Sequence, residues 1–128
     1  MPTILIADDH DLVRDTLAAF LAQTEGFEVL SASDLAGAEA HLSSPKHVDI
    51  ALLDYNMPGM NGLDGLRVAC TRHKHTKFAL MSGAATPKVA SDAVAMGAQG
   101  FFPKSAGAAS LIHAINFMLS GERYLPVE

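Results

Sequence analysis

Five polar residues stand where apolar, strand-like runs of the sequence end, namely Asp8, Asp9, Asp54, Ser82 and Lys104. In an open parallel sheet the carboxyl ends of all strands share one edge, so we expect these side chains to converge in one cleft. Three clustered carboxylates repel one another and stay ionised near neutral pH only if a cation shares the site. A hard divalent ion meets that need, and Mg²⁺ suits best because it typically binds through one or two carboxylates together with waters and phosphate oxygens.

Lys104 and Ser82 extend this chemistry to phosphate. An ammonium group and a hydroxyl are donors of the kind that the equatorial oxygens of a phosphoryl group need. A carboxylate is a suitable nucleophile toward phosphorus once a metal ion spreads the incoming charge. The combined set of residues therefore predicts a phosphoryl-transfer site.

Each of these residues also has an ordinary structural explanation. Asp8 and Asp9 are typical caps for a helix that begins near Asp11. Asp54 is suited to begin a turn, and Lys104 is of the type that usually stays solvated in a loop. The joint occurrence of suitable residues at four strand ends favours the functional interpretation.

The strand-like runs that lead to these residues cover 3–7, 47–53, 77–81 and 99–102, and a further one covers 27–32. The first two are nearly continuous apolar stretches, which are typical of strands covered on both faces. Helix-like stretches separate the runs. Strand followed by helix, five times over, predicts an α/β fold, namely a three-layer sandwich with a five-stranded parallel sheet.

Local signals place the helix ends. Ser33 is predicted to cap the second helix, and the third helix is expected over 61–72. Thr86 and Pro87 are a cap and a first-turn proline for the fourth helix. The last helix is expected over 106–119.

Composition indicates one globular domain. With 128 residues, of which 49% are hydrophobic and 18% charged, the chain can bury a sizeable core. A net charge of -5 disfavours direct contact with a nucleic-acid backbone. The single cysteine, Cys70, excludes an internal disulfide and suits a reducing cytoplasm. We found no candidate membrane span or signal peptide, so a cytoplasmic protein without membrane contact is expected.

Over essentially its whole length, the chain resembles the receiver domain of bacterial two-component response regulators. The resemblance rests on the acidic pair after the first strand, on Asp54 followed by Pro58 and Gly62, on Ser82, and on the stretch 101–105. Each motif alone is weak, whereas all of them in this order on strand ends are specific. The resemblance implies a flavodoxin-like (βα)5 fold.

The resemblance also implies roles for the acidic residues. Asp54 would be the phosphoacceptor, attacking a phosphohistidine on a sensor histidine kinase. Asp8 and Asp9 would hold Mg²⁺, with the backbone carbonyl of Asn56 as a further ligand. The carboxylate of Asp54 would also bind the ion.

The resemblance also implies that the remaining site residues bind the phosphoryl group or change position when it is attached. Ser82 would hydrogen-bond the phosphoryl group, and Lys104 would pair with it. Phe101, which stands where tyrosine is frequent in the family, would turn inward as the hydroxyl moves; a simple core role for this ring is an equal alternative. The peptide bond near Pro103 is cis in the family, so we expect strain in this loop.

The stretches 81–83, 97–101 and 121–126 resemble the NarL/LuxR subfamily, in which a helix-turn-helix domain follows the receiver. We therefore expect a receiver domain over 1–120, and a tail or linker over 121–128 that leads to a missing output domain. That domain would make any DNA contacts and control transcription, while the receiver would form a phosphorylation-dependent homodimer. A stand-alone receiver that acts by protein-protein interaction is the alternative.

Two other functions compete with the receiver interpretation. The stretch 9–13 fits the Asp-x-Asp-x-Thr/Val signature of haloacid-dehalogenase phosphatases, with Asp9 as nucleophile. Those enzymes need another acidic pair after the lysine, and only Glu122 and Glu128 remain, so we do not expect an enzyme. An interaction module with a decayed site is disfavoured because the site residues are all chemically competent.

Three other features of the sequence carry weaker signals. His10, beside the acidic pair, is expected to be a bystander. The group Cys70, His73 and His75 fits no standard metal-ligand spacing. Phe117 falls off the apolar stripe of the last helix, so we expect an exposed aromatic ring of the kind that marks an interface.

Overall fold

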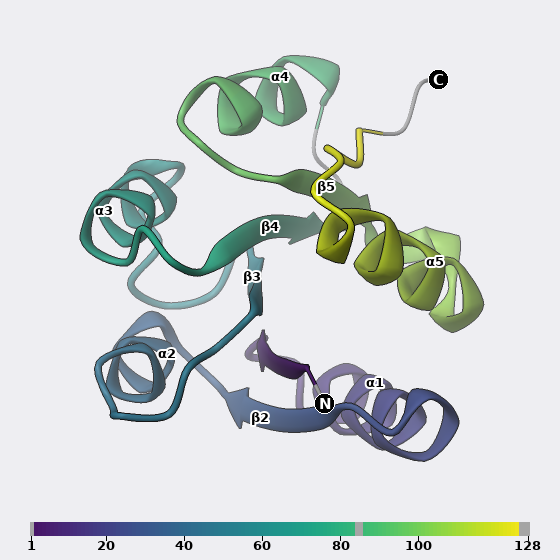
Figure 1. Cartoon of the computed structure of the whole chain (residues 1–128). Coiled ribbons are helices and arrows are strands. Elements are labelled where there is room, and N and C mark those ends of the chain that lie inside the picture. Colours follow the sequence, from purple (N-terminus) through teal and green to yellow (C-terminus); the bar gives the residue numbers. More distant parts are fainter. Residues whose placement is uncertain (1, 84–85, 126–128) are drawn as a thin grey trace.

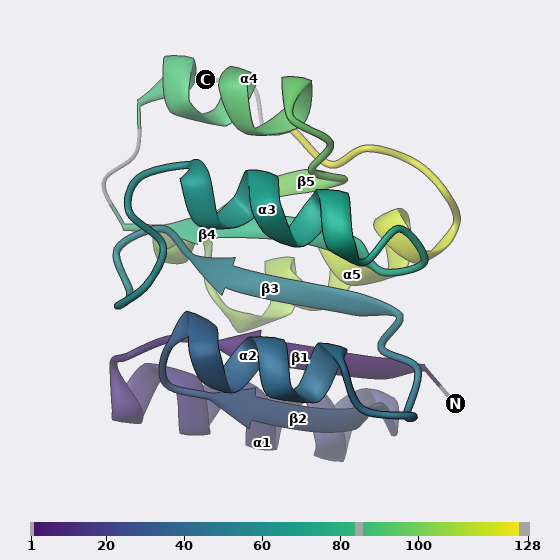
Figure 2. The ribbon, with the colours of Figure 1, turned by 90° about the vertical axis from the view of Figure 1, so that its left-hand side faces the viewer.

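Five parallel strands form a single sheet in the order β2-β1-β3-β4-β5, and helices cover both of its faces (Figures 1 and 2). The computed structural model describes residues 2–83 and 86–125. The strands are β1 (Thr3–Ala7), β2 (Glu28–Ala32), β3 (Ile50–Asp54), β4 (Lys77–Ser82) and β5 (Gly100–Pro103). The predicted flavodoxin-like three-layer sandwich is therefore confirmed.

The helices are divided between the two faces of the sheet, and each group packs on its own core (Figure 1). The first face carries α1 (Asp11–Glu25) and α5 (Ala108–Leu119), and the second carries α2 (Leu35–Leu42), α3 (Asp64–Arg72) and α4 (Pro87–Ala95). A short 3-10 helix, η1 (Lys104–Ala106), follows β5. None of the helices in the described part of the chain is long and apolar enough to cross a membrane.

The side chains of β1 alternate between two cores. Ile4 and Ile6 pack with the residues of α1 and α5, whereas Leu5 and Ala7 pack on the side of α2, α3 and α4. All four are fully buried. Burial on both faces explains why this strand is a continuous apolar run rather than an alternating one.

The strand order places a change of winding direction between β1 and β3. The chain passes from β1 outward to β2, and then returns across β1 to β3. In doubly wound sheets, ligands bind outside the carboxyl ends of the strands at this point. Asp8 follows β1 directly and Asp54 ends β3, so both lie at that position.

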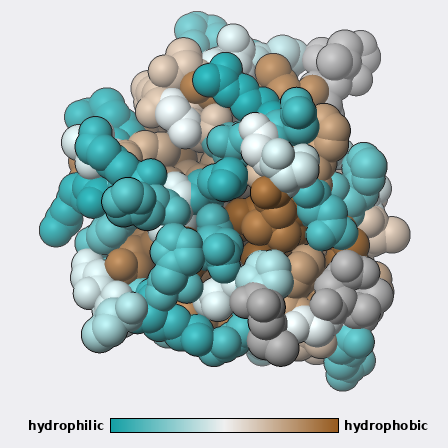
Figure 3. Space-filling view, viewed as in Figure 1, coloured by the Kyte–Doolittle hydropathy of each residue, from teal (hydrophilic) through white to brown (hydrophobic). Residues whose placement is uncertain are grey.

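The edge of the sheet at which the strands begin faces the viewer in Figures 1 and 3. The strands begin on this side, as the position of the N-terminus shows. The surface there is largely hydrophilic, with a hydrophobic area near its centre over the sheet (Figure 3). The candidate site lies on the far side of the molecule.

Two predicted element starts are wrong by one to three residues. Asp34, not Ser33, caps α2, because the Asp34 carboxylate accepts a hydrogen bond of 2.7 Å from the N–H of Gly37. The third strand begins at Ile50 rather than at residue 47. Just before it, the carboxylate of Asp49 accepts the N–H of Thr3 at 2.7 Å, so a side chain meets the edge of β1 there.

Two helices start later than expected. The third begins at Asp64 rather than at residue 61, because Asn61 has a φ of 52°, outside the helical region. The last begins at Ala108 rather than at residue 106, because Gly107, with a φ of 90°, separates η1 from α5.

Two further local predictions concern the start of α4 and the loop after Pro103. The hydroxyl of Thr86 accepts a hydrogen bond from the N–H of Val89 at 3.3 Å, and Pro87 is the first residue of α4, as predicted. No cis peptide bond occurs among the described residues, and Pro103 has ordinary extended torsions of -73° and 128°. The strain expected in this loop stays a prediction.

Candidate functional site

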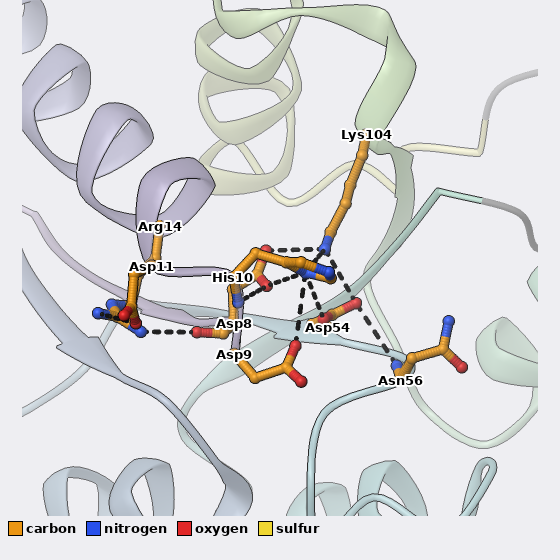
Figure 4. Close-up of polar contacts among 8 residues, drawn as sticks. All are labelled: Asp8, Asp9, His10, Asp11, Arg14, Asp54, Asn56 and Lys104. Atoms are coloured by element: carbon orange, nitrogen blue, oxygen red, sulfur yellow. Dashed lines mark hydrogen bonds and ion pairs between the residues drawn. The ribbon is translucent and has the colours of Figure 1, made fainter.

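Three carboxylates meet at the carboxyl ends of β1 and β3, and we call Asp8, Asp9 and Asp54 the acidic cluster (Figure 4). Asp8 is fully buried and Asp54 is 1% exposed. Asp9, next along the chain, has a side chain that is 38% exposed. The predicted convergence of residues far apart in sequence is what the geometry shows for these three.

Lys104 bridges the two buried carboxylates (Figure 4). Its Nζ atom lies 2.8 Å from Oδ2 of Asp8 and 3.2 Å from Oδ1 of Asp54. The lysine is the first residue of η1, so β5 delivers it to the same edge as β1 and β3. One ammonium group therefore faces two buried negative charges.

The pKa values of these three groups move in different directions. Burial opposes the ionisation of Asp8, but hydrogen bonds from Lys104 and from the backbone and ring of His10 outweigh it and hold the pKa of Asp8 below its usual value. Burial, followed by the charge of Asp8, raises the pKa of Asp54 despite the nearby lysine. Burial would lower the pKa of Lys104, but its contacts with Asp8 and Asp54 raise it, so the lysine stays charged.

The two carboxylate oxygens of Asp54 differ in their hydrogen bonds with the described residues. Its Oδ1 atom pairs with Lys104 and accepts a hydrogen bond of 3.4 Å from the N–H of Asn56. Its Oδ2 atom is buried and receives no hydrogen bond from the described residues. A buried carboxylate oxygen without a donor needs a cation or an electrophile. The oxygen-rich cluster therefore fits a hard divalent ion such as Mg²⁺.

His10 and Arg14 belong to the site although the sequence did not single them out as functional. The Nδ1 atom of His10 lies 3.0 Å from Oδ1 of Asp8 and 3.4 Å from Oδ1 of Asp9 (Figure 4). Arg14 donates a hydrogen bond of 2.9 Å to the carbonyl of Asp8 and fixes that loop on α1. The position of His10 directly after the acidic pair was the available signal for these contacts, and the expectation that it is a bystander in the chemistry stays a prediction.

Ser82 and Phe101 lie on the two strands beyond β3. Ser82 ends β4 and is 2% exposed. Phe101 lies in β5, and its side chain is buried in the core on the side of α4. Ser82 thus stands at the same edge as the acidic cluster, whereas the ring of Phe101 is already packed inward. The roles of both residues, and of the Asn56 carbonyl, stay predictions.

The cluster is the one group of metal-ligating side chains found among the described residues. His73 instead pairs with Glu39, with 2.8 Å between Nε2 and Oε2. Its neighbours Cys70 and His75 form no metal-binding group with it within residues 2–83 and 86–125.

This fold and this acidic edge agree with a match to a family model. The model for the response regulator receiver domain matches residues 4–116, so the chain belongs to that family. Receiver domains of this kind are signalling modules of two-component systems. The predicted family and function as a receiver are confirmed.

Similar full-length proteins extend beyond this chain. The glycerol metabolism activator of Pseudomonas putida is 36% identical over 129 residues, and the response regulator GacA of Pseudomonas viridiflava is 30% identical over 125 residues. Each alignment covers 98% of this chain and 58% of the relative. The chain therefore spans less than two thirds of the length of these relatives.

Solved structures of response regulators have the same fold as this chain. A LuxR family DNA-binding response regulator from Silicibacter pomeroyi is 35% identical, with a TM-score of 0.85 and 98% of both chains covered. The receiver domain of NarL from Mycobacterium tuberculosis is 29% identical, with a TM-score of 0.81 over 94% of this chain and 98% of that one. A CheY-like receiver from Methanospirillum hungatei JF-1 is 25% identical, with a TM-score of 0.85 over 94% and 95%. The likeness to the NarL/LuxR group is confirmed.

Proposed function

We propose that this receiver accepts a phosphoryl group on Asp54 from a phosphohistidine of a sensor histidine kinase. The supporting observation is Oδ2 of Asp54, a buried carboxylate oxygen that receives no hydrogen bond from the described part of the chain, at the strand edge beside Lys104. Oδ2 attacks phosphorus, the bond from phosphorus to the histidine nitrogen breaks, and the imidazole leaves with its electron pair. The product is an aspartyl phosphate with about two negative charges.

Asp8, Asp9 and Asp54 would hold Mg²⁺, with the carbonyl of Asn56 as a further ligand. When bound, the ion neutralises charge on the transferring phosphoryl oxygens. Lys104 is charged and already within 3.2 Å of Asp54, so it can pair with another phosphoryl oxygen. Ser82, one strand further along, supplies a hydroxyl to the third.

A small acyl phosphate tests this proposal without a kinase. Wild-type protein incubated with Mg²⁺ and the donor should gain one acid-labile phosphate, mapped by mass spectrometry to Asp54. Asp54→Asn should abolish labelling, whereas Asp64→Asn, at an exposed carboxylate in the first turn of α3, should not. A label on Asp9 would overturn the proposal and favour the phosphatase alternative.

The output is proposed from the relatives. Since the chain covers 58% of the curated relatives and resembles a LuxR family DNA-binding response regulator, we assign residues 1–120 to the receiver and 121–128 to a tail that leads to a DNA-binding domain. Residues 126–128 lie outside the described part. The net charge of -5 supports DNA contact through that domain alone. The protein would act in the cytoplasm as a switch rather than an enzyme.

Gel mobility shift separates this output from a stand-alone receiver. The 128-residue chain should not bind DNA in either phosphorylation state. A longer natural chain should bind, and phosphorylation should strengthen the binding through homodimer formation. DNA binding by the short chain would contradict the assignment.

A further inference from the structure

We propose that His10 supplies a nitrogen ligand to the acidic cluster and biases the site toward borderline divalent ions such as Co²⁺, relative to an all-oxygen magnesium site. The inference rests on the proposed metal site and adds a ligand to it. It concerns a ring that stands over the cluster in Figure 4 and that the proposed phosphoryl transfer does not use.

The distances match the edges of a coordination shell. The Nδ1 atom of His10 lies 3.0 Å from an oxygen of Asp8, 3.4 Å from one of Asp9 and 3.9 Å from one of Asp54. For metal-ligand bonds of about 2.1 Å, neighbouring ligands are separated by about 3.0 Å and opposite ligands by about 4.2 Å. The three observed distances fall inside that interval, and one ligand atom from each of the four side chains lies within 4.8 Å of the others, which is close enough to share an ion after adjustment.

Of the oxygens that face His10, Oδ1 of Asp8 accepts a hydrogen bond of 2.9 Å from the backbone N–H of His10, whereas Oδ2 of Asp54 has no donor among the described residues. Oδ2 of Asp54, which is the oxygen 3.9 Å from the ring, is buried and receives no hydrogen bond within the described residues. Asp8, which holds the shortest contact with the ring, is fully buried. This pairing of an unsatisfied buried carboxylate with an imidazole nitrogen is independent of the acidic residues' mere clustering and points to a shared cation.

In this structure the ammonium group of Lys104 supplies the positive charge beside the two buried carboxylates. Its Nζ atom contacts both buried carboxylates and lies 3.4 Å from Nδ1 of His10. An ion bound among the same atoms would take over the neutralisation of Asp8 and Asp54. His10 would then bind through Nδ1 with its proton on Nε2, and because its side chain is 64% exposed, solvent can exchange that proton.

Ligand type decides the selectivity. Carboxylate oxygens and water suit Mg²⁺, whereas imidazole suits zinc, nickel, copper and similar ions. Later first-row ions bind tighter than Mg²⁺ to most sites. A higher affinity for Co²⁺ than for Mg²⁺ therefore does not by itself show that His10 is a ligand. The informative quantity is the ratio of the Co²⁺ affinity to the Mg²⁺ affinity, and how that ratio changes when the imidazole is removed.

The test is calorimetric titration of the phosphate-free chain with Co²⁺ and, separately, Mg²⁺, together with the visible absorption of bound Co²⁺. His10→Ala and His10→Gln should each lose about tenfold in Co²⁺ affinity, in the range measured for perturbed metal sites. Their Mg²⁺ affinity should stay within about twofold, so the ratio should fall about tenfold and the Co²⁺ spectrum should change. His75→Ala removes an exposed histidine outside the cluster and should leave all three readouts unchanged.

The outcomes separate this inference from the proposed site. An unchanged ratio and spectrum in both His10 variants, with Asp9→Ala weakening both ions, would overturn the ligand role of His10 and leave the site standing. If Asp9→Ala and Asp54→Asn weaken neither ion, the proposed metal site itself is wrong. A fall in the ratio in His75→Ala as large as in His10→Ala would also overturn the inference, because binding would then be adventitious.

Discussion

The backbone N–H of Phe101 donates a hydrogen bond of 2.8 Å to the carbonyl of Tyr124. The N–H of Tyr124 in turn donates to the carbonyl of Gln99 at 3.0 Å, so the tail after α5 adds one bridging residue to the outer edge of β5. The ring of Tyr124 lies 6.5 Å from that of Phe102. The strand that carries the proposed switch residue is therefore bonded directly to the segment that follows α5.

Gly100→Ala should detach this tail. A Cβ atom at Gly100 would lie 2.7 Å from the carbonyl oxygen of Tyr124 and 2.8 Å from the sulfur of Met118. Overpacking of this kind typically costs about 1–3 kcal/mol. We expect a lower melting temperature and faster hydrogen exchange at the N–H of Phe101. Gly83→Ala, where a Cβ meets nothing within 4 Å, is the control. Unchanged exchange at Phe101 would show that the tail does not protect it.

Asp54→Asn is expected to stabilise the metal-free protein at neutral pH by a few degrees. Burial, followed by the charge of Asp8, raises the pKa of Asp54 from its ordinary value of 3.8. The folded state therefore holds this proton more tightly, so stability falls as pH rises from the ordinary to the folded pKa, and the loss persists above it. The gain from the substitution should shrink toward acid pH, as thermal melts with a chelator would show.

Asp8→Asn should lower the melting temperature at neutral pH, opposite to the effect expected for Asp54→Asn. The pKa of Asp8 is lowered because donors from Lys104 and His10 outweigh its burial. Its ionisation stabilises the fold above the ordinary value of 3.8, and this contribution is lost as pH falls through the folded pKa. Loss of charge-assisted hydrogen bonds costs about 1.5–3 kcal/mol. If both asparagine variants shifted the melting temperature in the same direction at pH 7, the two carboxylates would not differ as described.

The sequence was sufficient for the sheet and for part of the site, for a physical reason. Nearly continuous apolar runs identify strands buried on both faces, and parallel strands bring their carboxyl ends together, which placed Asp8, Asp54 and Lys104 correctly. The contacts of the His10 ring depend on its side-chain torsions, which no periodicity encodes. Two adjacent residues that can both cap a helix, such as Ser33 and Asp34, are likewise separated only by geometry. These are the features that the structure had to supply.

Ser82→Ala should allow phosphorylation but lose most of the output. Ser82 is buried at the end of β4, between the acidic edge and the strand that carries Phe101. Without its hydroxyl the phosphate has one donor fewer, and the switch loses its differential contact. Labelling by a small acyl phosphate should persist, whereas phosphate-dependent homodimer formation should drop. Normal dimer formation would remove Ser82 from the coupling.

Phe101→Leu tests the other half of this coupling. Truncation to alanine would cost about 3–5 kcal/mol at this buried ring, whereas leucine keeps most of its volume. We expect normal labelling with a reduced output, because packing alone must transmit the signal where no phenolic hydroxyl exists. Phe102→Leu, in the neighbouring core position, is the matched control. Equal output in both variants would mean that Phe101 is an ordinary core residue.

Phe117→Ala should weaken phosphorylation-dependent self-association about tenfold. The side chain of Phe117 is 39% exposed on α5, as its position off the apolar stripe predicted. One side of the ring is covered by the protein itself. The centroid of the Phe117 ring lies 6.1 Å from that of the stacked His113 ring and 6.3 Å from that of the Tyr124 ring, which meets it edge-on. The ring is thus held in place by the docked tail while presenting apolar area to a partner, as interface aromatics do.

Sedimentation of phosphorylated protein decides whether Phe117 lies in that interface. Wild type should gain mass on phosphorylation, and Phe117→Ala should gain little. Val68→Ala is the matched control, since Val68 is 40% exposed on α3, on the other face of the sheet. Because Phe117 also contacts Tyr124, hydrogen exchange at the N–H of Phe101 must stay slow in the variant for the loss to be assigned to the interface rather than to a released tail. Equal dimer formation in wild type and Phe117→Ala, or none in either, would remove Phe117 from the interface.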